Sequence, residues 1–145
     1  MEKVEPKYER LEEMDQIVTS LKEKYPDVFF AVNTSEIGCY CLVNKPRPDS
    51  KPEEVIINGA SGVFGKISPM KYILTAYATD WNCWNAAQRT IHVAKAIKRI
   101  SVDGEGKLVR FDEMNHRCFL DTFGLGYEEN MEIPNILEED VDWVL

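Results

Sequence analysis

One histidine in a predicted helix is the first residue of this sequence whose type and position suggest chemistry. His92 lies in the middle of QRTIHVAKAIKRI, residues 88–100. Zinc hydrolases often bind their metal with two histidines four residues apart on one helix, and the glutamate after the first histidine acts as general base. The corresponding positions here are Val93 and Ala96, which can neither accept a proton nor bind zinc. The helix alone therefore predicts no catalytic residue and no cofactor.

Two later residues could still complete a metal site with His92. Asp112 and His116 are acceptable zinc ligands, and a catalytic zinc ion needs about three protein ligands and an open position for water. Such a site requires both histidines of the chain to converge. A zinc site of His92, Asp112 and His116 is therefore the alternative, and a partly buried or surface histidine bonded to a neighbour is the simpler interpretation of His92.

The cysteines admit both structural and chemical interpretations. Four cysteines without a secretory signal favour reduced thiols over a disulfide scaffold. Cys39 and Cys41 share one face of a predicted strand, where they could pack in the core, clamp a metal or form a redox pair; packing is the simplest of these. Cys83 is expected beside the rings of Trp81 and Trp84. These two tryptophans either anchor the core or form an exposed aromatic patch.

Charge is distributed unevenly along the chain. The formal net charge of −8 argues against general binding of nucleic-acid phosphates. Residues 89–110 are nevertheless locally basic, with Arg89, Lys95, Lys98, Arg99, Lys107 and Arg110. A solvated helix face explains these side chains more simply than a nucleic-acid-binding module, which we keep as the less favoured alternative.

The C-terminal stretch EENMEIPNILEEDVDWVL alternates acidic with apolar residues and contains no Lys or Arg. Such a segment can dock on its own domain or bind a partner. We expect IPNIL to pack on the domain and the last eight residues to form an acidic extension. The predicted partner-binding residues are Glu138, Glu139, Asp140, Asp142 and Trp143.

Hydrophobic periodicity indicates the elements that would position these residues. The apolar stripe of the helix with His92 is Val93, Ala94, Ile97 and Ile100, which places His92, Lys95 and Arg99 on a different side. We expect three helices, over residues 7–25, 85–100 and 111–124. We also expect a hairpin of two strands over residues 28–43, with its turn at 33–36, and further strands at 55–58, 62–67 and 72–79. Asn82 or Asn85 is the expected cap of the second helix, and Gly124 is expected to end the third. The pattern predicts an α+β fold: a small, mostly antiparallel sheet of about four or five strands packed with about three helices.

Size and composition favour one domain. The chain has 145 residues, of which 44% are hydrophobic, enough to bury a core. We divide it into a single domain over residues 1–137 and the acidic extension over residues 138–145. No apolar run is long enough to span a membrane, so no membrane partner and a cytoplasmic location are expected.

The order of features in the second half of the chain resembles a known family. The strand YILTAYATDWNCW is followed by the helix AAQRTIHVAKAI, the turn VDGEGK, the stretch FDEMNHRCFLDTFGLGYE and finally IPNIL. Over residues 60–137 this succession resembles the phage metallopeptidases, a compact zincin-like family with an HExxH helix and an HD pair at the start of the next helix. The resemblance implies a zincin-like fold.

The resemblance also shows which motif residues differ. The first zinc histidine of the family corresponds to His92, its general base to Val93, and its second histidine to Ala96. The HD pair corresponds to Phe111 and Asp112. Most of the family's zinc site is thus replaced, which implies a degenerate metallopeptidase that is more plausibly a binding protein than an enzyme.

Three functional hypotheses follow. The leading one is a non-catalytic, phage-type protein that binds a host protein through a metallopeptidase-like scaffold and inhibits a bacterial defence system, as anti-CRISPR proteins do. Its acidic tail would face a basic nucleic-acid-binding protein of the host cytoplasm. The alternatives are a divergent zinc-dependent hydrolase using His92, Asp112 and His116, and a nucleic-acid-binding module using the basic region 89–110.

Overall fold

Four strands form one mixed sheet in the computed structural model, which describes residues 5–59, 70–100, 108, 119, 122–124, 126–128 and 130–143. The strands are β1 (Tyr8–Arg10), β2 (Ile37–Leu42), β3 (Ile56–Gly59) and β4 (Tyr72–Tyr77). Their order is β1-β2-β4-β3; both edge strands pair antiparallel, and the central β2 and β4 pair in parallel. The predicted α+β class is confirmed, whereas the zincin-like arrangement stays a prediction.

Three helices accompany the sheet in the described part of the chain: α1 (Glu12–Lys24), α3 (Ala78–Cys83) and α4 (Ala86–Ile97). Asn85 begins α4 with a capping box, in which its side chain accepts the backbone N–H of Gln88 at 2.8 Å. The Gln88 side chain in turn accepts the N–H of Asn85 at 3.1 Å. These two bonds satisfy amide groups that a helix start leaves without partners, so Asn85 is confirmed as one of the two expected caps.

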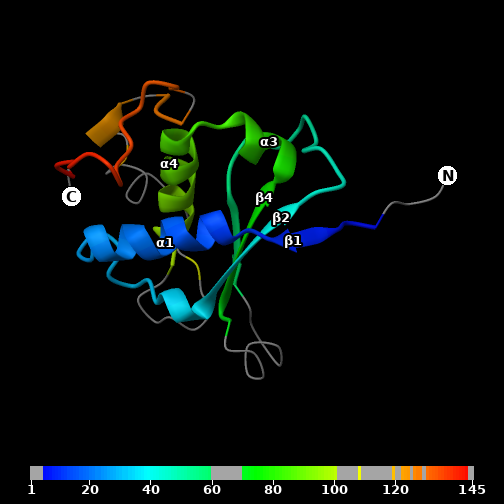
Figure 1. Ribbon diagram of the computed structural model, residues 1–145, viewed down its shortest axis with the longest axis horizontal. Helices are drawn as coiled ribbons and strands as arrows, with labels where there is room; N and C mark the ends of the chain where they lie inside the picture. Colours follow the sequence, from blue (N-terminus) through cyan, green and yellow to red (C-terminus); the bar gives the residue numbers. More distant parts are fainter. Residues whose placement is uncertain are drawn as a thin grey trace.

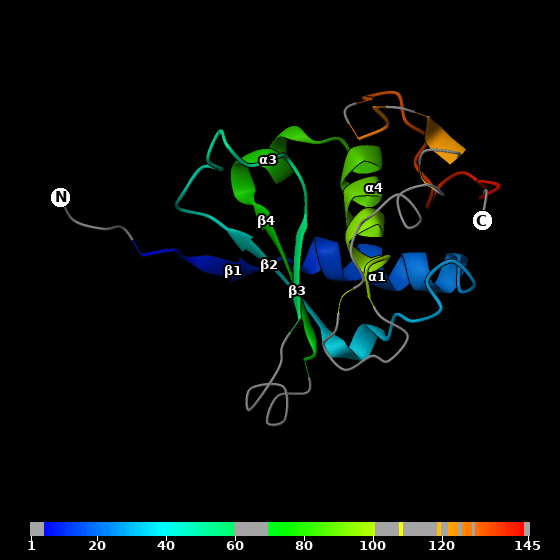
Figure 2. The same cartoon turned by 180° about the vertical axis from the view of Figure 1, so that it is seen from behind.

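Both long helices, α1 and α4, lie on the same side of the strands, as Figures 1 and 2 show from opposite directions. Alternate residues of β4, namely Tyr72, Leu74 and Ala76, are buried, as expected for a strand with one face on the core. The core also takes buried side chains from α1 and α4. The sheet and these helices therefore enclose one apolar core, and α3 continues directly from the end of β4.

The first third of the chain differs from the prediction in two places. Residues 8–10 form β1 instead of the start of a helix, because they pair with residues 40–42 of β2. Residues 28–31 form turns instead of the first strand of a hairpin. Val28 and Phe29 are buried there, and their backbone N–H groups donate to the carbonyl of Tyr25. Their apolar character thus reflects burial beside the end of α1 and not a strand.

Other predicted elements are confirmed or only slightly changed. The 3-10 helix η1 (Thr34–Glu36) occupies the predicted turn and leads into β2. β4 ends two residues earlier than expected because α3 begins at Ala78. Gly124 has φ of 86°, which suits glycine at the predicted end of the third helix. The strand expected at 62–67 lies outside the described residues, as do residues 111–118 of that helix.

Within the described ranges, no helix has the length and apolar character needed to cross a bilayer.

Candidate functional site

His92 lies inside the core and not on a side of α4 away from it. The residue is only 2% exposed, and its ring stacks on that of Trp84, with ring centroids 4.0 Å apart and planes inclined by 13°. The predicted separation of His92 from the apolar stripe, and its partly buried or surface position, are therefore wrong. Trp84 comes from the segment between α3 and α4, which folds back over the histidine.

The surroundings of His92 favour its neutral form. Burial lowers the pKa of His92 to about 4, and the charge of Lys95 acts in the same direction; the carboxylate and backbone of Glu128 oppose them. Among the described residues Nδ1 of the ring has no hydrogen-bond partner. His92 is thus a neutral imidazole stacked on an indole.

The described residues do not fit a zinc ion at His92. Val93 and Ala96 are buried in the core, as their apolar side chains require. No three His, Cys, Asp or Glu side chains converge within the part of the chain that the structure describes. Asp112 and His116 lie outside the described residues, so the alternative zinc site stays a prediction.

The tryptophans of DWNCW anchor the core. Trp81 and Trp84 are both buried, and their rings meet edge to face at a centroid distance of 6.2 Å. Cys83 between them is exposed, so the predicted packing of its thiol beside the rings is wrong. Of the other thiols, Cys39 is fully buried, which raises its pKa, and Cys41 is half-buried.

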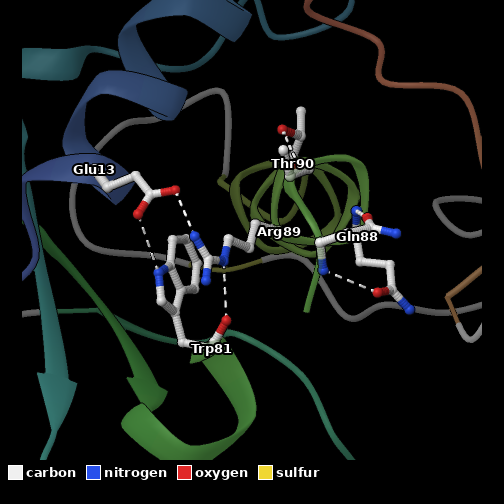
Figure 3. Close-up of polar contacts among 7 residues, drawn as sticks. Glu13, Trp81, Gln88, Arg89 and Thr90 are labelled. Atoms are coloured by element: carbon white, nitrogen blue, oxygen red, sulfur yellow. Dashed lines mark hydrogen bonds and ion pairs between the residues drawn. The ribbon is translucent and has the colours of Figure 1, made fainter. Parts of the chain in front are cut away.

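One acidic side chain of α1 binds both Trp81 and Arg89, as Figure 3 shows. Glu13 accepts from Nη1 of Arg89 at 2.9 Å and from Nε1 of Trp81 at 3.4 Å. Nε of Arg89 donates to the Trp81 carbonyl at 2.9 Å, and its guanidinium lies 5.2 Å from the Trp81 ring centroid. Arg89, a candidate for binding nucleic acid, therefore connects α1, α3 and α4 within the molecule.

Two further cations of the basic region have internal partners. Lys95 forms an ion pair with Glu128 at 3.1 Å, and Lys98 donates to the carbonyl of Val28 at 2.7 Å. Lys107 and Arg110 lie outside the described residues. The contacts that are described thus use the basic side chains to hold the fold, which favours the simpler interpretation over a nucleic-acid interface.

The acidic segment, which we define as residues 132–143, is fastened to the end of α1. The hydroxyl of Tyr25 lies 2.7 Å from the carbonyl oxygen of Ile136 and 3.2 Å from that of Glu139. Nζ of Lys24 donates to the Glu139 carbonyl at 2.8 Å. Ile133 and Ile136 are buried, so the expected packing of IPNIL on the domain is confirmed.

An aromatic cluster holds the end of the acidic segment. The half-buried ring of Trp143 meets the rings of Tyr25, Phe29, Phe119 and Phe123 edge to face, with centroids 5.3 to 6.2 Å apart. Aromatic rings favour this geometry because the positive edge of one faces the negative face of the other. Trp143 thus packs on its own domain, and a contact of this ring with a partner stays a prediction.

The acidic side chains of the segment point outward while its backbone is held. Glu138, Glu139, Asp140 and Asp142 are all exposed, and only Asp140 has a described ion pair, 3.6 Å from Lys24. The four predicted acidic residues are thus exposed on a stretch of chain that is held to the domain. Tyr25 and Lys24, which hold this stretch in place, are not among the predicted site residues. No local signal could have identified them, because more than 100 residues separate the two segments.

A cleft of about 340 Å³ beside the start of α1 is a weaker candidate. It contains Arg10 and Asp15, whose Nε and Oδ2 atoms lie 2.9 Å apart. Because each charge already has its partner in the other, we assign no ligand to this cleft.

Comparison of the chain with protein-family models, curated proteins and solved structures finds no match. The resemblance to phage metallopeptidases therefore rests on the quoted motifs alone and stays a prediction.

Proposed function

We propose that this chain is a non-catalytic, phage-type protein that binds a basic surface of a host protein through its acidic segment. In this proposal it acts against a bacterial defence system by covering a nucleic-acid-binding surface, as an anti-CRISPR-like inhibitor would. The metallopeptidase-like scaffold serves to hold this segment in place.

The arrangement of the acidic segment is the observation that carries the proposal. The carbonyls of Ile136 and Glu139 bind the end of α1 and the side chains of Ile133 and Ile136 are buried, whereas Glu138, Glu139, Asp140 and Asp142 are exposed. A free acidic tail would have to be ordered on binding, which costs conformational entropy. A segment already held in place avoids much of this cost and presents its charges in one geometry.

Electrostatic complementarity explains why the partner would be basic. Exposed charges at the edge of an interface change mainly the association rate, which rises when opposite charges attract the two proteins. A protein that binds nucleic acid carries a Lys- and Arg-rich surface for phosphates. Exposed carboxylates on a backbone held in place would compete for that surface.

Charge neutralisation tests the proposal. One variant carries Glu138→Gln, Glu139→Gln, Asp140→Asn and Asp142→Asn; a matched control carries Glu5→Gln, Glu9→Gln, Asp49→Asn and Glu53→Gln. The control positions are exposed: Glu5 precedes β1, Glu9 belongs to it, and Asp49 and Glu53 lie in the loop after β2, away from the acidic segment (Figures 1 and 2). Both variants lose the same formal charge, so net charge alone cannot distinguish them.

Both variants and the unmodified protein are used to capture partners from the bacterial host, and the affinity for the purified partner is then measured at two salt concentrations. We expect the first variant to bind at least about tenfold more weakly at low salt, with a smaller salt dependence, and the control to bind nearly as tightly as the unmodified protein. Equal losses in both variants, or the same affinity in all three proteins, would contradict the proposal.

A further inference from the structure

Phe30 is an exposed aromatic side chain at the same end of the molecule as the acidic segment. It is 62% exposed, whereas its neighbour Phe29 is buried. The ring of Phe29 meets that of Trp143 at a centroid distance of 6.2 Å. The turn after α1 and the acidic segment are thus packed together, and Figures 1 and 2 show them at one end of the longest axis.

The lysines described around this turn bind backbone carbonyls of the chain itself. Nζ of Lys22 lies 2.9 Å from the carbonyl oxygen of Phe29 and 3.1 Å from that of Phe30. Lys98 donates to Val28, and Lys24 donates to Glu139. These cations fix the turn and the acidic segment in place, and their charges are directed toward the protein.

The carboxylates at this end are exposed to solvent, unlike the lysine charges, which are directed toward the protein. Glu23 and Asp27 are exposed on either side of the end of α1, and the four exposed acids of the acidic segment lie nearby. Phe30 is thus an exposed ring on a turn whose carbonyls Lys22 binds, and the exposed carboxylates of Glu23 and Asp27 lie close to it in sequence. Phosphate groups of nucleic acids and anionic lipids would be repelled by these carboxylates, which leaves a basic protein as the matching partner.

We propose that Phe30 is the aromatic anchor of this acidic end, and that it enters an apolar pocket within the basic surface of the partner protein. This inference rests on the proposed function and adds the apolar part of the contact. Aromatic residues at the centre of an interface often contribute most of the affinity, while surrounding charges guide the approach and orientation. A turn already fixed by Lys22 would lose little freedom on binding.

Site-specific photocrosslinking tests the position of the anchor. A photoreactive phenylalanine analogue is placed in the full chain at Phe30, at Glu139 or at Tyr8, and the protein is irradiated in the bacterial host. Tyr8 is the control because it is 54% exposed and belongs to β1 at the opposite end. We expect positions 30 and 139 to crosslink to the same protein and position 8 not to.

Affinity for that purified partner tests the energetic role. Phe30→Ser is expected to weaken binding at least about tenfold, and Phe30→Leu to restore part of the loss, because leucine keeps an apolar side chain. Tyr8→Ser should leave binding unchanged. Circular dichroism should give the same thermal transition for Phe30→Ser as for the unmodified protein, since the ring is exposed.

The outcomes separate this inference from the proposed function. Crosslinking from position 139 without crosslinking from position 30, or normal affinity of Phe30→Ser, would overturn the anchor and leave the acidic binding surface intact. Absence of crosslinks from both positions, together with unchanged affinity of the four-acid variant, would overturn both.

Discussion

His92 shows how its surroundings set the chemistry of one residue. The imidazole stacks on Trp84 inside the core, and burial keeps it neutral. A neutral imidazole that packs against an indole contributes apolar contact area. Its Nδ1 atom has no hydrogen-bond partner among the described residues, and the burial of this atom therefore carries a desolvation cost. We infer that His92 now serves packing.

The pH dependence of stability tests this interpretation. The folded-state pKa of His92, about 4, is below its ordinary value of 6.5, so the unfolded chain binds more protons between these two pH values. Its contribution is therefore fully present above pH 6.5 and is lost as the pH falls toward 4, by on the order of 3 kcal/mol in all. Urea unfolding of the unmodified protein and of His92→Phe at pH 7, 6, 5 and 4 measures the difference between them. Parallel pH profiles would show that His92 does not titrate as a buried group.

Metal removal tests the alternative role of the same residue. We expect purified protein to contain far less than one zinc ion per chain and its thermal transition to be unchanged by a chelator. Elemental analysis and calorimetry measure these two quantities. Stoichiometric zinc that is lost in His92→Ala but retained in the matched variant His116→Ala would point to a site different from the one predicted. Loss in both variants would support the site of His92, Asp112 and His116.

At the scale of elements, the end of α1 determines the position of the acidic segment. Tyr25 and Lys24 bind its carbonyls, and Tyr25 also contacts the Trp143 ring. Lys24 is the last residue of α1 and Tyr25 is its C-cap. The same turn buries Phe29 and exposes Phe30, so a single short segment organises the packing and the surface of this end.

Removal of one hydroxyl tests this attachment. Tyr25→Phe deletes the contacts with the Ile136 and Glu139 carbonyls but keeps the ring beside Trp143. We expect a loss of about 1 kcal/mol in unfolding free energy and faster amide exchange over residues 136–143. Hydrogen exchange with mass spectrometry measures the local effect. Tyr8→Phe, which changes an exposed ring at the other end, is the control, and an equal effect in both variants would contradict the attachment.

At the scale of the whole molecule, charge is sorted by position. Arg89, Lys95 and Lys98 connect elements to one another, and the acids of the C-terminal segment face solvent. The chain has 17 basic and 25 acidic residues, and four of its exposed acidic residues lie within positions 138–142, just before Trp143. Such a surface suits a basic protein better than a nucleic acid.

A nucleic-acid-binding assay tests whether the basic side chains are available to phosphates. We expect no binding of double-stranded or single-stranded DNA by fluorescence anisotropy at about physiological salt, because the described basic side chains hold internal contacts. Binding that weakens with salt, and weakens further after Lys95→Gln and Lys98→Gln, would favour the nucleic-acid-binding alternative. Lys45→Gln in the loop after β2 is the matched control.

Local patterns predicted the elements whose residues interact mainly with close neighbours in sequence. The strand-like composition of β2, the alternation of β4, the apolar face of α4 and the Asn85 cap can all be recognised within a few residues. The same kind of pattern failed at residues 28–31, where Val28 and Phe29 have the composition of a strand but are buried by a turn. At residues 28–31 the apolar composition indicates burial, but contacts with neighbouring segments of the protein decide the backbone conformation.

The sequence by itself determined the α+β class, the apolar residues Val93 and Ala96 on the helix with His92, and the acidity of the C-terminal end. Only the tertiary structure decided that Trp84 covers His92, that Glu13 binds Arg89, and that Tyr25 holds the acidic segment. The physical reason is the range of the interactions. Helix periodicity and capping act over three or four residues, whereas these contacts join segments that folding alone brings together.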